Sequence, residues 1–268
     1  MVIAYPVANK QKSIDICRAF VAGCGGVVTH KAAYLEKGDA PAFFYGVDAS
    51  NVHIWEQVRR EGRDFYYCDN SYFDATRQTY FRVTKNSIQH SGEGTSNGAR
   101  FAALNIPIEL TRHEPNGHIV ICPQSDWFMR AIVDYSAEPG AWLRDAQAHF
   151  RSSAPEHAQR VRHWEPDKAK LARSLPDDLV GAWALVTHSS AAAVTALLSG
   201  VPVFCSAHSA AYPMSSTIDR ADGIMLALAH WEESSRRAWA GVLADNQWTL
   251  EEMRYGQCWA DLQQKEAL

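Results

Sequence analysis

Apolar runs and helical repeats alternate along the first 70 residues of the chain. Residues 1–7 form an apolar run of the length of a buried strand, and residues 13–24 place apolar side chains at helical spacing. Two more apolar runs, 41–48 and 65–70, lie on either side of a second helical pattern over 51–62. Strands that alternate with helices in this way favour a parallel sheet with helical crossovers.

A polar, aromatic and glycine-containing segment follows over residues 71–117. Its centre, HSGEGTSNG at 90–98, has the composition of an exposed loop. Long loops in compact domains are usually either functional or disordered. A substrate-binding loop and a disordered excursion are therefore both open for this segment.

The strand and helix patterns restart at residues 118–122, HIVIC. The most regular stretch is 183–206, which reads as a strand, a tight turn, a helix, a glycine stop and a strand. The tail over 246–262 predicts two helical pieces, and the first has a capping-box pattern formed by Thr249 and Glu252. The second half therefore predicts another α/β unit followed by helices.

The two α/β patterns predict two Rossmann-like lobes with a cleft between them. We place the first lobe at 1–114, the second at 115–247, and closing helices at 248–268. In open α/β sheets, ligands bind outside the carboxyl ends of the strands. The segments that directly follow the strands are therefore the first place to look for chemistry.

Composition predicts a soluble globular protein. The chain has 268 residues, a formal net charge of −4, 47% hydrophobic residues and 21% charged residues, with a pI near 6.2. Its apolar stretches are broken well before the ~18 residues of a membrane span. Residues 1–13 lack the features of a secretory signal. We expect a cytoplasmic protein with no membrane insertion.

The six cysteines predict buried free thiols. No two of them have C-x-x-C spacing, and most lie inside apolar runs. Such thiols are typical of a reducing compartment, and a zinc site needs clustered ligands. We therefore expect no metal site.

The segment after strand 183–187 carries the clearest chemical signal. His188, Ser189 and Ser190 occupy a turn and the first positions of a helix. A helix start offers unpaired backbone N–H groups and the positive end of the helix dipole, which suit a phosphate. The simpler interpretation is that Ser189 caps the helix and His188 is an ordinary turn residue. The chain lacks a P-loop and a G-x-G-x-x-G motif, which disfavours a standard dinucleotide-binding enzyme.

A family resemblance rests on residues 186–204, VTHSSAAAVTALLSGVPVF. This segment resembles the donor-binding segment of GT-B glycosyltransferases, and it is most similar to the versions in capsule and surface-polysaccharide enzymes and in bacteriophage homologues. The resemblance is good over about 175–215 and weaker over 118–126 and 248–259. It implies two GT-B-like lobes that transfer sugar from a nucleotide diphosphate sugar, a UDP-sugar above all, with no other cofactor.

Two departures from the family pattern are visible. Many GT-B enzymes have a glutamate inside this helix that binds the nucleotide ribose, where this chain has Thr195. The chain is also shorter than most of the group. Ribose recognition must therefore differ, or the donor must.

The resemblance and the strand ends together assign residues to the donor. The donor candidates are Gln124, Ser125, His188, Ser189, Ser190, His208 and Tyr212. The first two follow strand 118–122 and would flank the nucleotide or its phosphates. The next three form the turn before the helix and would face the pyrophosphate. The last two follow the next strand of the lobe.

Inverting sugar transfer needs a general base that deprotonates the acceptor hydroxyl. A metal is not required if a helix dipole and cationic side chains stabilise the leaving diphosphate, and no D-x-D motif is present. Asp69, at the end of strand 65–70, is the first candidate for the base, and an Asx turn with Asn70 is its simpler interpretation. His90 is the second candidate. The acceptor-binding candidates are Asn70, Tyr72, Arg82 and Lys85.

The acceptor expectation rests on the resemblance to phage enzymes that glycosylate hydroxymethylated DNA bases, which would place the protein in a host cytoplasm. Aromatic side chains in the first lobe would stack on an extruded base. They are Tyr66, Tyr67, Tyr72, Phe73, Tyr80 and Phe81. The acidic pI disfavours DNA, because phosphate contacts dominate DNA affinity. We place 5-hydroxymethylcytosine DNA narrowly ahead of a surface glycan.

Other functions stay open beside this one. A capsule or surface-polysaccharide glycosyltransferase would use the same donor with a glycan acceptor. A sugar-nucleotide epimerase or hydrolase would need no acceptor groove and would release product without an acceptor. A non-catalytic nucleotide-binding module would not depend on Asp69, His90 or His188.

Overall fold

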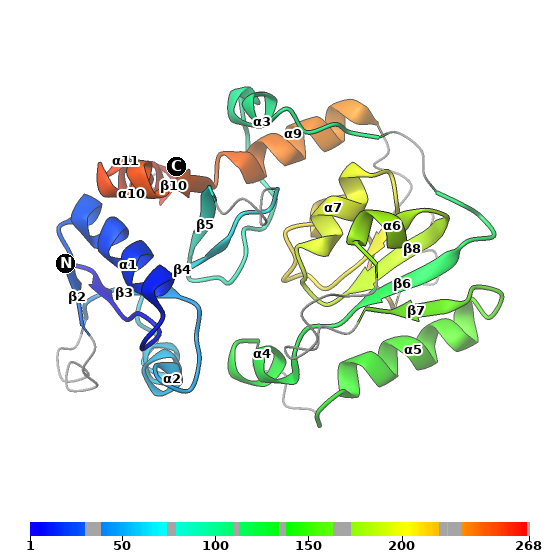
Figure 1. Cartoon of the computed structure of the whole chain (residues 1–268), viewed down its shortest axis with the longest axis horizontal. Coiled ribbons are helices and arrows are strands. Elements are labelled where there is room, and N and C mark those ends of the chain that lie inside the picture. The colour runs from blue at the N-terminus through cyan, green and yellow to red at the C-terminus, as the bar shows by residue number, and fades with distance from the viewer. Residues whose placement is uncertain are drawn as a thin grey trace. The chain divides into compact units, whose positions relative to one another are not determined.

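The computed structural model describes residues 1–29, 39–73, 79–109, 113–133, 138–162, 173–219, 224 and 232–266. The chain forms two compact units, whose elements are labelled in Figure 1. The first unit joins Met1–Gln89 to Asn246–Leu268, and the second is His90–Asp245. Each unit has its own β-sheet with helices packed against it.

The first unit is built on a six-stranded sheet of order β10-β5-β4-β3-β1-β2. Its strands are β1 (Ile3–Ala4), β2 (Val27–Val28), β3 (Ala42–Tyr45), β4 (Phe65–Asn70), β5 (Tyr80–Lys85) and β10 (Gln247–Thr249). β1 to β4 run parallel, whereas β5 pairs antiparallel with β4 and β10 pairs antiparallel with β5. Because β2 and β3 lie on opposite sides of β1, the strand order reverses at β1 and β3.

Helices cover both faces of this sheet. They are α1 (Gln11–Cys24), α2 (Val52–Arg60), α10 (Leu250–Arg254) and α11 (Gln257–Glu266). Successive side chains of a strand point to opposite faces. In β3, Phe43 stacks on Phe20 of α1 with ring centroids 4.0 Å apart, whereas Phe44 meets Trp55 of α2 edge-on. The apolar run 41–48 is therefore buried on both sides.

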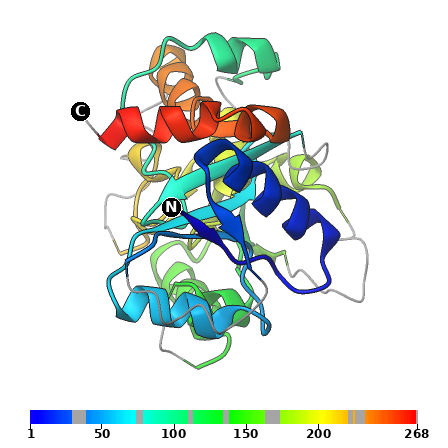
Figure 2. The same ribbon diagram turned by 90° about the vertical axis from the view of Figure 1, so that its left-hand side faces the viewer.

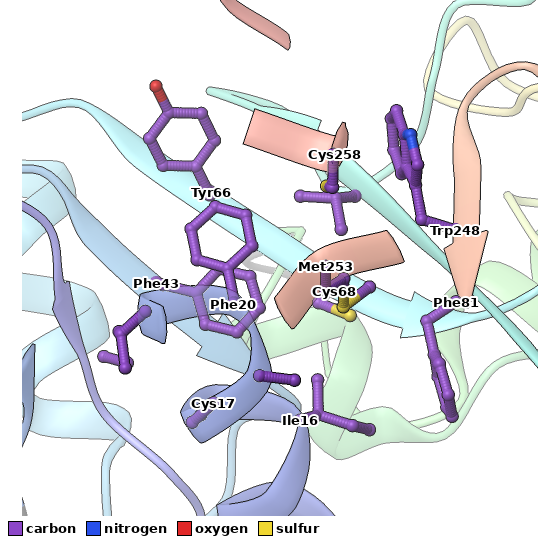
Figure 3. Packing of buried hydrophobic residues seen from close by; sticks show 14 of the residues in the cluster. Ile16, Cys17, Phe20, Phe43, Tyr66, Cys68, Phe81, Trp248, Met253 and Cys258 are labelled. Atoms are coloured by element: carbon purple, nitrogen blue, oxygen red, sulfur yellow. The ribbon is translucent and has the colours of Figure 1, made fainter. Parts of the chain in front are cut away.

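The C-terminal segment completes the first unit. β10 adds a strand beside β5, and its Trp248 is fully buried. Met253 and Cys258, from α10 and α11, join the same hydrophobic cluster as Phe43 (Figure 3). Figure 2 shows these two helices next to α1. Thr249 and Glu252 exchange hydrogen bonds at the start of α10, which confirms the predicted capping box.

The second unit is built on a four-stranded parallel sheet of order β7-β6-β8-β9. Its strands are β6 (His118–Cys122), β7 (Gln159–Val161), β8 (Ala182–Thr187) and β9 (Val203–Phe204). Its helices are α3 (Ala99–Leu104), α4 (Asp126–Ala131), α5 (Ala141–Ser153), α6 (Leu175–Leu179), α7 (Ala192–Leu198), the 3-10 turn η2 (Tyr212–Met214) and α9 (Glu233–Ala244). Ile119 and Ile121 of β6 pack with Ala184 and Val186 of β8 and with Phe150 of α5. The whole of β6 is buried, as expected for a central parallel strand.

The predicted α/β fold with two Rossmann-like units is confirmed. The chain divides at Gln89 and at Asp245, whereas the sequence pattern placed the divisions at 114 and 247. Residues 90–109 belong to the second unit, where α3 packs on α9. The tail belongs to the first unit because β10 pairs with β5.

The polar segment 90–98 is packed against α9. A Cβ on Gly92 would lie 2.6 Å from the carbonyl oxygen of Ala210 and 2.9 Å from Nε1 of Trp239, so only glycine fits there. Ser96 donates a 2.6 Å hydrogen bond to Asp245 at the end of α9. These contacts make the segment part of the second unit and contradict the alternative of a disordered excursion.

All six cysteines are free and five are buried, as the sequence predicts. Burial raises the pKa of Cys17 and of Cys122 to about 12. These thiols therefore stay protonated at neutral pH and are poor nucleophiles. Among the described helices, none is long and apolar enough to cross a membrane.

Candidate functional site

The carboxyl ends of β6 and β8 form the switch point of the second sheet. β7 lies on one side of β6 and β8 on the other, so the strand order reverses between β6 and β8. Loops that leave the two strands at such a point diverge and open a crevice, where ligands of α/β proteins bind. Gln124 follows β6, and His188 and Ser189 follow β8. The structure thus brings predicted residues from both loops to one place.

Gln124 and Ser189 are joined by two hydrogen bonds. Nε2 of Gln124 donates to Oγ of Ser189 over 2.6 Å, and the backbone N–H of Ser189 donates to Oε1 of Gln124 over 3.2 Å. Below them, Thr187 Oγ1 donates to the carbonyl oxygen of Cys122 over 2.6 Å. Both ends of the Gln124 amide are therefore engaged, and its orientation is fixed.

His188 lies next to the hydrogen-bonded pair of Gln124 and Ser189, which we call the junction, and it is a neutral imidazole. Its side chain is buried, and its Nδ1 is 3.1 Å from Oγ of Ser189. Since Ser189 Oγ accepts a hydrogen bond from Gln124, its own hydrogen can be donated to Nδ1 of a neutral His188. Burial, with a smaller contribution from His208, lowers the pKa of His188 to about 4. The His208 ring is stacked on it at 5.9 Å, and Trp142 meets it edge-on at 6.4 Å.

The backbone amides of this turn bond to side chains of the protein, whereas the sequence led us to expect them free for a pyrophosphate. The N–H of Ser189 donates to Gln124, and that of Ser190 donates to Oγ1 of Thr187 over 3.2 Å. The N–H of Ala192 points to Oγ of Ser190 at 3.3 Å. Side-chain oxygens thus accept hydrogen bonds from the backbone N–H groups that we expected to bind a pyrophosphate. The residue before α7 is Ala191, so Ser189 is not its N-cap either.

A pocket of about 590 Å³ opens beside the junction. Its walls come from the start of α4, the start of α5 and the loops before them. The lining combines apolar side chains, among them Phe128 and Trp142, with polar ones, among them Gln124, Arg130 and Glu138. Small-molecule sites have this size and this mixture of apolar walls with few polar groups. Gln124 and Trp142 connect the pocket to the His188 cluster.

Local hydrogen bonds hold the two walls in place. Ser125 caps α4, because its Oγ accepts from the N–H of Phe128 at 3.2 Å. Asp126 Oδ1 accepts from the N–H of Gly140 over 2.6 Å and ties the start of α4 to the start of α5. Ser125 lines the pocket while its hydroxyl caps α4, and its assignment as a donor residue stays a prediction.

The two remaining donor candidates have different surroundings. His208 is exposed and its backbone N–H donates to Ser206, whose N–H and Oγ both donate to the carbonyl oxygen of His188. Tyr212 lies in η2 with an exposed side chain. Within the described residues, no hydrogen bond or ring contact joins the Tyr212 side chain to the junction.

Asp69 and Arg82 form an ion pair at the carboxyl end of β4 in the first unit. Arg82 Nη2 lies 2.6 Å from Oδ2 of Asp69, and Nη1 donates to the carbonyl oxygen of Asn70. Oδ1 of Asp69 accepts from the N–H of Asn70 over 2.7 Å. Arg82 is buried, and its guanidinium covers the ring of Tyr72, which is also buried. Three of the predicted acceptor residues are thus brought around Asp69.

Lys85 is placed away from this cluster. It is the last residue of β5, which runs antiparallel to β4, so it pairs with Tyr66 near the start of β4. Its ammonium lies 3.0 Å from Asp64. Because β5 runs antiparallel to β4, Lys85 lies at the other end of the strand pair from Asp69 and Arg82. Its role as an acceptor-binding residue stays a prediction.

His90 belongs to the second unit. Its Nδ1 accepts a 3.0 Å hydrogen bond from the N–H of Gly92, which closes a turn in segment 90–98. Its role as a second candidate base stays a prediction. Within the described ranges, no three His, Cys, Asp or Glu side chains are placed to hold a metal ion.

The cluster around Asp69 and Asn70 contains two further residues, Lys12 and Tyr45, that no sequence pattern identifies. Lys12 Nζ donates to Oδ1 of Asn70 over 2.9 Å, and the Tyr45 hydroxyl donates to the same oxygen over 3.1 Å. Lys12 comes from the first turn of α1 and Tyr45 from the end of β3. Only the parallel order of β1, β3 and β4 places these carboxyl ends at one edge.

No family model matches the chain, and no curated protein sequence matches it. Among solved structures, it is similar to the Thermosulfurimonas dismutans KpsC beta Kdo 2,7 transferase, with a TM-score of 0.51 and 15% identity over 85% of this chain and 89% of that chain. The T. dismutans KpsC beta Kdo 2,4 transferase aligns with a TM-score of 0.47 and 14% identity over 76% and 79%. The first likeness shows a shared glycosyltransferase-like fold.

Proposed function

We propose that the chain is a glycosyltransferase whose second unit binds a nucleotide-sugar at the carboxyl ends of β6 and β8. The observation that carries the proposal is the pocket of about 590 Å³ at the switch point, with Gln124 held in one orientation by Ser189. A fixed amide beside an apolar wall is the arrangement that orients a small ligand in a pocket. The glycosyltransferase-like fold supports the same reading.

The lining of the pocket suggests how the donor is recognised. Trp142 and Phe128 supply flat apolar surface for a nucleobase, and Arg130 supplies a cation for phosphate oxygens. Glu138 supplies a carboxylate that can accept hydrogen bonds from ribose hydroxyls. This carboxylate would take the part of the glutamate that is absent at Thr195. Side chains, rather than the backbone amides before α7, would then hold the donor.

We propose a glycan hydroxyl as the acceptor. Tyr66, Tyr67, Tyr72 and Phe81 are at most 5% exposed, so they cannot stack on an extruded base. The DNA acceptor expected from the sequence thereby loses most of the side chains on which it depended. The neighbours' printed activity, Kdo transfer, makes nucleotide-activated Kdo one donor to test beside UDP-sugars.

Asp69 is our candidate general base. Its side chain is 35% exposed, and each carboxylate oxygen accepts one hydrogen bond from the protein. A carboxylate oxygen has a second lone pair. Arg82 and the N–H of Asn70 would therefore orient the carboxylate while a lone pair stays available for the acceptor hydroxyl.

A transfer assay tests this proposal. The protein is incubated with UDP-sugars, other nucleotide-sugars and activated Kdo, each with a panel of glycans or with 5-hydroxymethylcytosine DNA, and products are identified by mass. We expect a mass increase of one sugar on a glycan. Sugar release without an acceptor would indicate a hydrolase, modified DNA would restore the DNA acceptor, and donor binding without turnover would indicate a binding module.

A further inference from the structure

The first sheet has a switch point of its own, between β1 and β3. Lys12 lies in the first turn of α1, close behind β1, and reaches Asn70 at the end of β4. Its ammonium also lies over the rings of Tyr45 and Phe81, 5.2 Å from each centroid. Lys12 therefore projects along the carboxyl edge of the sheet, where α/β proteins bind ligands.

Lys12 forms no ion pair with any residue that the structure describes. Among the described residues, no carboxylate oxygen lies within 4 Å of its Nζ, and its contacts are an amide oxygen and two ring faces. Lys10, two residues earlier, is by contrast paired with Asp48 at 3.3 Å. Burial lowers the pKa of Lys12, and the negative charge of Asp69 opposes this effect. Burial has already removed part of the water around this ammonium. An anion that binds to it would therefore stabilise the charged form at a smaller additional desolvation cost.

The neighbouring charges compensate one another without Lys12. Arg82 and Asp69 form an ion pair with each other at 2.6 Å, and the other amino group of Arg82, Nη1, donates a hydrogen bond to the carbonyl oxygen of Asn70. The cluster of Lys12, Arg82 and Asp69 thus carries two cations and one anion. The surplus charge is that of Lys12, which is half-buried, whereas Arg82 is buried.

Asn70 adds further hydrogen-bond donors beside the ammonium. An ammonium has donors only, so the amide oxygen of Asn70 must face Lys12, and the Tyr45 hydroxyl bonds to the same oxygen. The Asn70 amide is thereby fixed, and its Nδ2 has no acceptor within the described part of the chain. Lys12 retains two of its three N–H donors. Donors on two adjacent groups match the two oxygens of a carboxylate or phosphate.

We propose that Lys12 and Nδ2 of Asn70 bind an anionic group, a carboxylate or a phosphate, on the acceptor. This inference rests on the proposed glycosyltransferase function and narrows its acceptor to an acidic glycan. Tyr45 and Phe81 would guide the ammonium, and the Asp69–Arg82 pair would lie next to the bound group.

Lys12→Met and Lys12→Arg test the proposal, with Lys10→Met as the matched control. Methionine keeps the apolar stem over Tyr45 and Phe81 and removes the charge, whereas arginine keeps the charge. Each variant is assayed with an acidic acceptor and with its neutral form, the methyl ester or the dephosphorylated glycan. We expect Lys12→Met to raise KM for the acidic acceptor by about 10- to 100-fold, the loss of one hydrogen bond to a charged group. In Lys12→Met, the KM for the neutral acceptor and the donor affinity should stay as in the unmodified chain. Lys10→Met should leave the KM for both acceptors unchanged, and Lys12→Arg should recover much of the loss.

A direct binding measurement separates this inference from the proposed function. The intact protein, with its lysines labelled biosynthetically at ¹³Cε and ¹⁵Nζ so that every ammonium keeps its three N–H donors, is titrated with glucuronate, inorganic phosphate and glucose, and the Lys12 resonance is identified from Lys12→Arg. A saturable shift with either anion but not with glucose supports the anion site, even if no sugar transfer is found. If transfer occurs, but Lys12→Met treats acidic and neutral acceptors alike and the anions leave the Lys12 signal unmoved, the inference is overturned while the glycosyltransferase stands.

Discussion

At the residue scale, a chain of side-chain hydrogen bonds organises the site of the second unit. Gln124 donates to Ser189, and Ser189 lies within hydrogen-bond distance of the buried His188 ring. The chain fixes the rotamers of all three side chains before any ligand arrives. A preorganised polar group binds a ligand at a smaller entropic cost than a mobile one. Because Ser189 is itself fully buried, we expect it to act only through Gln124, by holding that amide in place for a ligand.

His188 should make stability depend on pH. Burial, with His208, lowers its pKa from 6.5 to about 4. In acid the unfolded imidazole takes up a proton below pH about 6.5, whereas the folded one stays neutral until about pH 4, so the free energy of unfolding falls across this window. Denaturant titrations at about pH 7.5 and about pH 4.5 should show a smaller loss for His188→Asn than for the unmodified chain. An identical loss would contradict the buried neutral imidazole. The free energy of unfolding should still fall somewhat with falling pH in His188→Asn, because burial also lowers the pKa of His113 and His118.

Asp69→Asn should slow transfer without weakening the donor complex. The amide keeps the shape of the side chain but cannot accept the acceptor's proton, so kcat should fall by about 100-fold or more. Donor affinity measured by calorimetry should be unchanged. Asp15→Asn, on the exposed face of α1, is the matched control. A kcat within a few-fold of the unmodified enzyme would assign the base elsewhere, with His90→Gln as the next variant.

Part of this site could be predicted from the sequence. Gln124, Ser125 and Ser189 directly follow recognisable strands, so the rule for strand ends finds them. Lys12 and Trp142 lie on helices and reach the sites only through tertiary packing, which no local pattern encodes. Backbone amides before α7 were assigned to a ligand, because the sequence does not show that side-chain oxygens of the same loops reach them.

At the element scale, the direction of each strand decides which residues can cooperate. Arg82 and Lys85 both belong to β5, yet only Arg82 reaches the carboxyl end of β4. The apolar runs of the parallel strands were visible in the sequence because those strands are buried on both faces. β10 was not, since a strand of three residues directly before a capping box has no pattern of its own.

Gly23→Ala tests how the C-terminal helices attach to α1. A Cβ at this position would lie 2.0 Å from the carbonyl oxygen of Met253 and 2.9 Å from Cα of Gly256, so the helices would have to separate. We expect a loss of about 1–3 kcal/mol in the free energy of unfolding, as for other overpacked contacts. Arg18→Ala, on the exposed side of α1, should have little effect in the same denaturation experiment. Equal stabilities of the two variants would rule out this close contact.

At the scale of the whole molecule, one chain builds two sheets that reverse their strand order at comparable places. Each switch point gathers polar side chains: Gln124 and Ser189 in the second unit, Lys12 and Asn70 in the first. The two clusters differ in charge, because the second-unit junction is neutral whereas the first-unit cluster has a cation in excess. The surplus cation agrees with an acidic acceptor in the first unit, whereas the anionic diphosphate of a donor in the second unit would be bound by Arg130 of the pocket.

Truncation after Asp245 should affect the units unequally. It removes β10, α10 and α11, and with them the buried Trp248 and Met253 from the first core, and it leaves β5 as an open edge. We expect the amides of β3 and β4 to lose their protection against hydrogen exchange, while those of β6 and β8 keep it. Unchanged protection in β3 and β4 would show that the tail is dispensable for the first unit.

Calorimetric titration of nucleotide-sugars into the unmodified chain, Gln124→Ala and Ser153→Ala shows whether the second-unit pocket binds the donor. Ser153 lies at the exposed end of α5, outside the pocket lining, and serves as the control. If the second-unit pocket holds the donor, one nucleotide-sugar should bind, Gln124→Ala should weaken it by about 5- to 50-fold, and Ser153→Ala should leave it unchanged. A Gln124→Ala variant that binds this donor as tightly as the unmodified chain would show that the donor site lies elsewhere.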